Sequence, residues 1–224
     1  MSNFREQQEG VRPLIYNVAS FTKPAGDLPS LLTIDEARTM YHEFGHALHG
    51  LLTQCKYKGV SGTSVAQDFV ELPSQIMEHW AVEPEVLKMY AKHYQTREAI
   101  PDSLIAKIEI SIVQPGLYDY RTVGSCILDM EMHCLTTMEG FDVLQFEKQL
   151  MDKLGLIPQI APRYRSTYFN HIMGGYAAGY YSYIWLNVWI QMPLKRLRNM
   201  ACSTRLPLLL SARTFWKKVA QTTR

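Results

Sequence analysis

A helix-start signal at residues 33–36 (TIDE) precedes two histidines one helical turn apart, and this combination constrains the fold more than any other feature of the sequence. Thr33 can accept a hydrogen bond from a free N–H group of the first turn, and Glu36 can reach back to the N–H of Thr33, which makes a capping box. The sequence therefore predicts a helix that runs from here to about Cys55 and carries His42 and His46.

The two histidines belong to the pattern H-E-x-x-H at residues 42–46 (HEFGH). Successive helical residues are about 100° apart, so both imidazoles project from the same face and can share one metal ion. Neutral imidazole is a common zinc ligand. His42 and His46 are therefore candidate metal ligands, and Glu43 lies beside them, where its carboxylate can take a proton from water without ligating the metal.

A third ligand is needed for an open, hydrolytic zinc site. The metzincin pattern requires glycine and histidine at positions that are here His49 and Leu52, so that class is excluded. Glu71 begins the next predicted helix, with Gln75 and Glu78 on the same face, and is the candidate. His49 remains an alternative ligand, although we favour its interpretation as a neighbour of the site.

Helical periodicity dominates the rest of the chain. Asp68 is the expected N-cap of the second helix, and Pro73 falls in its first turn, where the missing N–H costs little. A glycine-containing loop at residues 56–67 separates the first two helices, and a single strand is expected at residues 13–19. Further helices are expected at residues 85–94, 102–113, 118–139 and 143–154. These patterns predict a mainly α fold with a small β element near the N-terminus.

Residues 169–183 combine three glycines with four tyrosines. If this stretch is helical, Tyr176 and Tyr183 face the same way, because they are seven positions apart. Phenol groups can donate hydrogen bonds to a carbonyl oxygen that gains negative charge during amide hydrolysis, and His171 precedes them across flexible glycines. The alternative is an aromatic core stripe. The composition alone leaves both interpretations open.

The charge and the cysteine content of the chain indicate in which cell compartment the protein works and what it binds. The four cysteines form no C-x-x-C pair, and neither an N-terminal apolar leader nor an apolar run of about 18 residues is present. We therefore expect a cytoplasmic protein with reduced thiols and no membrane partner. Residues 1–185 contain 15 basic and 21 acidic side chains, a net charge of −6, whereas residues 186–224 contain eight basic and no acidic ones.

Four separated segments, in order, resemble the thimet oligopeptidase family of zinc metallopeptidases: residues 42–49, 68–75, 163–169 and 171–183. Residues 78–80 and 163–169 are most similar to its bacterial peptidyl-dipeptidase (dipeptidyl carboxypeptidase) branch. The resemblance implies a zincin-like, multi-helix catalytic domain that hydrolyses peptide bonds in short oligopeptides and releases C-terminal dipeptides. Arg163 and Arg165 are candidates for holding a substrate carboxylate, and residues 59–64 match a flexible loop of the family.

The same resemblance assigns roles to individual residues. It implies that His42, His46 and Glu71 bind one Zn²⁺ ion per chain and that Glu43 is the general base. It also implies that three further residues hold the substrate and stabilise the tetrahedral oxyanion: His171, Tyr176 and Tyr183.

Members of this family are much longer than this chain, so the missing N-terminal portion of the same enzyme is an expected partner, besides short peptide substrates. We interpret residues 1–185 as a partial metallopeptidase catalytic domain. We interpret residues 186–224 as a basic tail foreign to the family, produced by a reading-frame change or an artificial join. Reading the coding DNA beyond codon 185 in the other two frames tests this: a frame that gives an acidic, helical sequence is expected.

Two alternatives remain. The chain could be a zinc-binding fragment without activity, because the wall supplied by the missing portion is absent. The basic tail could instead form a module that binds nucleic acid or an anionic membrane. However, Pro193 and Pro207 interrupt any continuous basic helix, so we expect no nucleic-acid partner.

Overall fold

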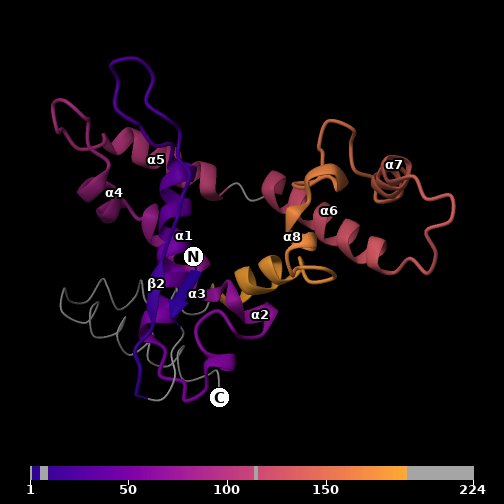
Figure 1. Cartoon of the computed structure of the whole chain (residues 1–224). Helices are drawn as coiled ribbons and strands as arrows, with labels where there is room; N and C mark the ends of the chain where they lie inside the picture. The colour runs from indigo at the N-terminus through magenta and orange to yellow at the C-terminus, as the bar shows by residue number, and fades with distance from the viewer. Residues whose placement is uncertain (1, 6–9, 114–115, 191–224) are drawn as a thin grey trace. The chain divides into compact units, whose positions relative to one another are not determined.

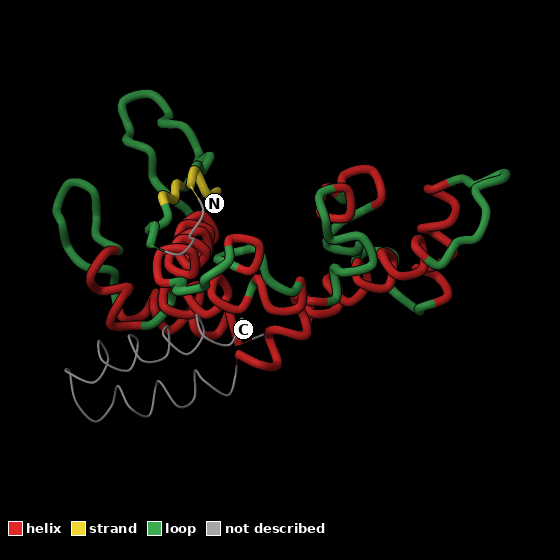
Figure 2. The backbone as a smooth tube through the Cα atoms, turned by 60° about the horizontal axis from the view of Figure 1, so that its bottom comes forward, coloured by secondary structure: helices red, strands yellow, loops and turns green. Residues whose placement is uncertain are grey.

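The computed structural model describes residues 2–5, 10–113 and 116–190 (Figure 1). Helices dominate these residues, and the strands that they contain form one two-stranded sheet near the N-terminus (Figure 2). The predicted mainly α fold with a small β element is therefore confirmed. No helix within the described ranges has both the length and the apolar character needed to cross a bilayer. The basic tail predicted at residues 186–224 lies, from residue 191 onward, outside the described residues.

The chain divides into two compact units, Met1–Ile108 with Leu186–Arg224, and Glu109–Trp185. The described elements of the first unit are β1 (Ser2–Arg5), β2 (Leu14–Tyr16), α1 (Ile34–Leu52), the 3-10 helix η1 (Lys58–Val60), α2 (Gln67–Val70), α3 (Leu72–Ala81), α4 (Pro84–Tyr90) and the start of α5 (Asp102–Val113).

Strand β2 falls inside the predicted strand at residues 13–19. Its antiparallel partner β1 was not predicted; the two pair with Ser2 opposite Tyr16 and a register shift between Asn3 and Arg5.

Helix α1 begins as its capping box predicts. The N–H of Glu36 donates to Thr33 Oγ1 at 3.2 Å, and the N–H of Thr33 donates to Glu36 Oε2 at 2.8 Å. These bonds satisfy donors that a helix N-terminus otherwise leaves unpaired. The hydrogen bond from the N–H of Thr33, together with the bonds from Thr22, lowers the pKa of Glu36 to about 2. The helix ends at Leu52, slightly before the predicted Cys55.

The second predicted helix is divided in two. Asp68 is not its N-cap: α2 begins at Gln67, and Ala66 in the N-cap position makes no side-chain cap. Glu71 then occupies the N-cap position of α3, in a helical backbone conformation. Pro73 falls in the first turn of α3, as expected, because its missing N–H would have no intrahelical partner there.

Helices α1 and α3 approach each other backbone to backbone. A Cβ atom added to Gly45 would lie 2.5 Å from the carbonyl oxygen of Pro73 and 2.6 Å from Cα of Ser74. Such distances are shorter than any normal contact, so only glycine fits at this crossing. On α3, Ile76 is almost completely buried and packs with Ile190, Leu72 and Trp80. The glycine thus lets α3 lie close along α1, and the apolar cluster packs Ile190 against α3.

The second unit contains the end of α5, then α6 (Gly116–His133), α7 (Val143–Lys153), the 3-10 helix η2 (Ser166–Tyr168) and α8 (Asn170–Met173). A further helix begins at residue 182 in this unit, and its described part, up to residue 190, belongs to the first unit from Leu186 onward. Helix α5 has its predicted bounds, and α7 ends one residue before its predicted end. Helix α6 ends at His133, six residues before the predicted residue 139, and α4 ends at Tyr90, four residues before the predicted residue 94. Asp142 caps α7 by accepting from the N–H groups of Leu144 and Gln145. The buried core of this unit is Cys126, Leu128, Leu150, Phe169, Ile172 and Tyr180.

Candidate metal centre and active site

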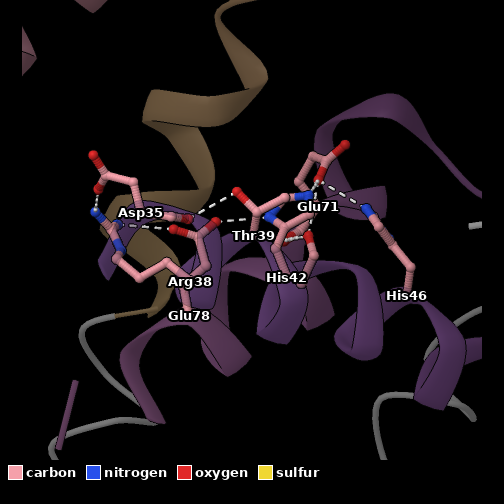
Figure 3. A network of polar contacts seen from close by, with 8 residues as sticks. Asp35, Arg38, Thr39, His42, His46, Glu71 and Glu78 are labelled. Carbon is pink, nitrogen blue, oxygen red and sulfur yellow. Dashed lines mark hydrogen bonds and ion pairs between the residues drawn. The ribbon is translucent and has the colours of Figure 1, made fainter. Parts of the chain in front are cut away.

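His42, His46 and Glu71 converge on one point between α1 and α3 (Figure 3). Glu71 Oε2 lies 3.2 Å from His42 Nε2 and 3.1 Å from His46 Nε2. The two imidazole rings stand edge to face, with centroids 4.9 Å apart, as expected for positions i and i+4. One ligand atom from each residue lies within 4.8 Å of the others, so the three donors can face a common ion.

The chemistry of these donors fits a metal ion. Two imidazole nitrogens and one carboxylate oxygen are the ligand set of hydrolytic zinc sites, and they suit other divalent transition metals as well. All three side chains are at most one-fifth exposed, which limits competition by bulk water. The structure thus brings together the three residues predicted as ligands, in a geometry that could hold a metal.

The electrostatic field at this point favours positive charge. Burial by itself lowers the pKa of His42, but hydrogen bonds and charge interactions with Glu71 and Glu78 outweigh burial and raise the pKa to about 10. Burial likewise opposes ionisation of Glu71, yet the two histidines hold the pKa of its carboxyl well below the usual range. The same negative surroundings also favour a metal cation, because the metal and the proton compete for the same lone pairs on the histidine nitrogens and the carboxylate.

Two residues of α3, Ser74 and Glu78, form hydrogen bonds to the candidate ligands. Ser74 is fully buried, and its Oγ lies 2.8 Å from both Oε2 and the backbone carbonyl oxygen of Glu71, two acceptors for its one proton. Glu78 Oε1 lies 2.6 Å from His42 Nδ1. By contrast, Nδ1 of His46 is buried and has no hydrogen-bond partner among the described residues. The two histidines are therefore held to different degrees.

His49 stands apart from this group. It is almost completely buried, its ring packs edge-on to Phe69 at 6.1 Å, and it does not belong to the cluster of possible metal ligands found in the described ranges. Burial, with a smaller contribution from His46, lowers its pKa to about 4. This environment suits a neutral neighbour of the site and not a third imidazole ligand.

Glu43 follows His42 on α1 and is half-buried. Its backbone carbonyl accepts a hydrogen bond of 3.0 Å from Nδ2 of Asn17, just beyond β2, so this part of α1 is tied to the N-terminal sheet. Glu43 therefore directly follows His42 on the helix that carries both candidate histidine ligands, and its role as a general base stays a prediction.

The other three predicted site residues gather in the second unit. The rings of His171 and Tyr176, and those of His171 and Tyr183, have centroids 5.9 Å apart. The Tyr176 and Tyr183 rings stack at 5.4 Å with an interplanar angle of 23°. The helix on which their proximity was predicted is absent, however: residues 174–181 form turns, and only Tyr183 lies on the helix at residues 182–190.

A buried carboxylate organises these turns. Asp129 on α6 is completely buried and accepts hydrogen bonds from the N–H groups of Ala178 at 2.9 Å and Tyr180 at 3.0 Å. His133 Nδ1 lies 2.9 Å from Oδ1 of Asp129, the oxygen that also accepts from Ala178. Ala178 has a φ angle of +52°, which is strained for a residue other than glycine, and its bond to Asp129 helps to hold it there.

Comparison with known proteins decides the family. The model of Peptidase family M3 matches residues 1–199, most of the chain. The chain belongs to peptidase family M3. This family consists of metallopeptidases, in agreement with a cluster of two histidines and one glutamate.

Individual M3 relatives show the same affiliation. The chain is 47% identical to dipeptidyl carboxypeptidase of Escherichia coli over 191 residues, which cover 83% of the chain and 28% of the relative. It is 38% identical to oligopeptidase A of the same organism, over 79% of the chain and 27% of the relative. Mitochondrial intermediate peptidase 1 of Cryptococcus neoformans is 35% identical over 77% of the chain. The chain thus spans little more than a quarter of the length of the bacterial relatives.

Three structurally important residues of this M3 chain escaped the sequence analysis: Gly45, Ser74 and Asp129. A signal existed for Gly45, because a glycine inside a helix costs about 1 kcal/mol relative to alanine and so needs a reason. Ser74 and Asp129 carried no comparable signal. A serine after a proline and an aspartate within a helix are both common on protein surfaces, and only the fold shows that these two are buried.

Proposed function

We propose that this chain forms the metal-binding part of a zinc peptidase that hydrolyses peptide bonds in short oligopeptides and releases C-terminal dipeptides. The observation that carries the proposal is the convergence of His42, His46 and Glu71 within 4.8 Å. Membership of a peptidase family supports hydrolysis. The similarity to a protein named dipeptidyl carboxypeptidase supports dipeptide release.

In this proposal His42, His46 and Glu71 hold one zinc ion. When bound, zinc polarises the scissile carbonyl and acidifies water. Glu43 takes a proton from the attacking water and delivers it to the leaving amine, as a general base and then a general acid. His171, Tyr176 and Tyr183 orient the substrate and donate hydrogen bonds to the oxygen that becomes negative. Ser74 keeps the Glu71 carboxylate turned toward the histidines.

We further propose that residues 1–185 are a partial catalytic domain. The whole enzyme would then be similar in length to the relatives, and its remaining part would complete the substrate-binding cleft. Apolar side chains such as Val18, Leu31 and Phe44 are strongly exposed here, which supports a missing covering part. A cytoplasmic location is part of this proposal; one relative is named probable cytosolic oligopeptidase A.

The foreign origin of the basic tail also stays a proposal. The family match continues to residue 199, 14 residues into the proposed tail, and leaves residues 200–224 unmatched. It therefore supports a foreign origin for residues 200–224 only. An acidic, helical translation of the coding DNA in another frame after codon 185 is the expected finding; its absence in both other frames overturns the proposal.

The main test measures zinc content together with the release of dipeptides from the C-terminus of a short peptide. The wild-type chain is compared with Glu43→Gln. We expect both proteins to hold one zinc per chain, and we expect the variant to lose turnover by a factor of about 10²–10⁴, the usual worth of a general base. Full activity of the variant overturns the role of Glu43. A wild-type chain that binds zinc but releases no dipeptide identifies a metal-binding fragment without activity, the second candidate.

A further inference from the structure

Glu78 joins α3 to α1 through both of its carboxylate oxygens (Figure 3). Oε1 lies 2.6 Å from Nδ1 of His42, and Oε2 lies 2.8 Å from Nη2 of Arg38. The Glu78 side chain is 23% exposed and that of Arg38 is 37% exposed, so this bridge is partly shielded from water. Neither residue belongs to the group of candidate ligands, which is His42, His46 and Glu71.

The contact with Glu78 determines which nitrogen of His42 carries a proton. An ionised carboxylate can only accept hydrogen bonds, so Nδ1 of His42 must donate to it. In the neutral ring the lone pair then resides on Nε2, and this is the atom that faces Glu71 Oε2. The tautomer that binds a metal through Nε2 is therefore the one that Glu78 selects.

Arg38 keeps Glu78 in place. It precedes His42 by one turn on α1, so a single helical face presents the guanidinium to one oxygen of Glu78 and the imidazole to the other. Asp35, in the first turn of α1, lies 3.8 Å from Arg38 Nη1 and contributes to holding the guanidinium. The order of contacts is Asp35 to Arg38, Arg38 to Glu78, and Glu78 to His42.

We propose that Glu78, held by Arg38, is the positioning residue of the metal site and fixes the ring orientation and tautomer of His42. This inference rests on the proposed metal site. It also predicts an asymmetry, because Nδ1 of His46 has no such partner among the described residues. Losing Glu78 should loosen one of the two imidazole ligands while the other stays as it is.

The test measures the zinc dissociation constant of the 224-residue chain by competition with a chromophoric chelator. The variants are Glu78→Ala, Glu78→Gln and Arg38→Met; Glu85→Gln, an exposed glutamate on the neighbouring helix α4, is the matched control. Outer partners of metal-bound histidines are worth about 10–100-fold in affinity. We expect a loss in this range for Glu78→Ala, and a smaller loss for Glu78→Gln, whose amide oxygen still accepts from Nδ1. Arg38→Met should also lose less, and the control should match wild type.

A second measurement separates positioning from general stability. The visible absorption bands of the Co²⁺-substituted protein report on ligand geometry, and the melting temperature of the metal-free protein reports on folding. We expect altered Co²⁺ bands in Glu78→Gln at a metal-free melting temperature equal to that of Glu85→Gln. If Glu78→Ala does not fold, Glu78→Gln and Arg38→Met decide the question.

Two negative results have different meanings. If all Glu78 and Arg38 variants that fold bind zinc within twofold of wild type, with unchanged Co²⁺ bands, Glu78 is not a positioning residue, and the metal site itself stands. If the wild-type chain binds no zinc, or if His46→Ala binds it as tightly as wild type, the proposed metal site fails, and the role of Glu78 fails with it.

Discussion

Gly45 lies so close to Pro73 that a single added carbon atom would come within 2.5 Å of the proline carbonyl oxygen. Gly45 directly precedes His46 on α1, at a position that faces Pro73 and Ser74 of α3. Close contact there lets the first turn of α3 reach the histidines, and Glu71 immediately precedes that turn. The spacing of the two helix backbones and the convergence of the three candidate ligands therefore have the same cause.

The first prediction concerns Gly45→Ala. In an exposed helix this substitution stabilises by about 1 kcal/mol. Here the new methyl group meets backbone atoms of Pro73 and Ser74, which cannot rotate away. We expect a net destabilisation of about 1–3 kcal/mol, the usual cost of overpacking, together with weaker zinc binding because Glu71 is displaced. Chemical denaturation and chelator competition measure the two effects.

Gly59→Ala is the control for this substitution. A Cβ atom at Gly59 would meet no atom within 4 Å, so stability and zinc affinity should stay near the wild-type values. Equal behaviour of the two variants would show that the helices can separate at no cost, and the close approach at Gly45 would then have no bearing on the metal site.

The second prediction concerns Tyr183, whose ring stacks on Tyr176 beside His171. If its hydroxyl stabilises the developing oxyanion, Tyr183→Phe should lower kcat by about 10²–10³, the cost of removing one oxyanion donor, and change KM little. Tyr181→Phe is a matched control, since Tyr181 is close in sequence and exposed. Steady-state kinetics on a short peptide measures kcat and KM, once the wild-type chain has been shown to be active. An effect on KM alone would contradict an oxyanion role.

The sequence predicted those parts of the fold that depend on local signals. The capping box at Thr33 placed the start of α1, and the pattern of residues 102–113 gave the observed bounds of α5. Local signals did not predict those elements whose conformation depends on a segment far away in the sequence. Strand β1 forms by pairing with β2, and the turns that carry Tyr176 are held by Asp129, about fifty residues earlier.

The candidate metal site was predictable for a similar reason. His42 and His46 lie one turn apart on one helix, so their proximity follows from helix geometry alone. Glu71 could be named only through the resemblance and the next helix start. The roles of Glu78 and Ser74 depend on how α3 lies along α1, and no spacing within either helix contains that information.

The third prediction concerns Asp129→Asn. The carboxylate accepts from two backbone N–H groups, of Ala178 and Tyr180, and contacts His133. An asparagine would have to turn its NH₂ group toward one of these donors and leave it unsatisfied. A buried donor without a partner costs about 1–3 kcal/mol, so we expect a loss of that size in unfolding free energy and faster amide exchange at residues 176–180.

The matching control for that variant is Asp152→Asn. Asp152 forms an exposed ion pair with Lys148 on α7, and such pairs contribute little. If Asp129→Asn were no less stable than Asp152→Asn and showed unchanged exchange at Ala178, Asp129 would not hold the tyrosine-bearing turns.

Glu147 on α7 forms a second buried anchor in the same unit. Its carboxylate accepts from Arg165 Nε at 2.6 Å and from the N–H and Oγ of Ser166 at 2.8 and 2.7 Å. Burial opposes its ionisation, but these bonds outweigh burial and hold the pKa of Glu147 below its usual range. Arg165, a sequence candidate for holding a substrate carboxylate, is thus engaged by a carboxylate of its own chain.

This anchor gives the fourth prediction, a specific acid sensitivity. Because folding lowers the pKa of Glu147, its contribution to stability is complete above the pKa of the unfolded chain, about 4.3 for glutamate, and is lost as the pH falls through the lower folded value. Glu147→Gln should therefore be less stable than wild type at pH 6–7, with a difference that shrinks as the pH falls below about 4.

Glu139→Gln, at an exposed position, is the control and should show no such pH-dependent difference. Urea unfolding of the three proteins between pH 3 and 7 measures the effect. A stability difference between wild type and Glu147→Gln that is constant across this range would mean that Glu147 titrates alike in the folded and unfolded chain, and the anchor would then contribute through packing and not through charge.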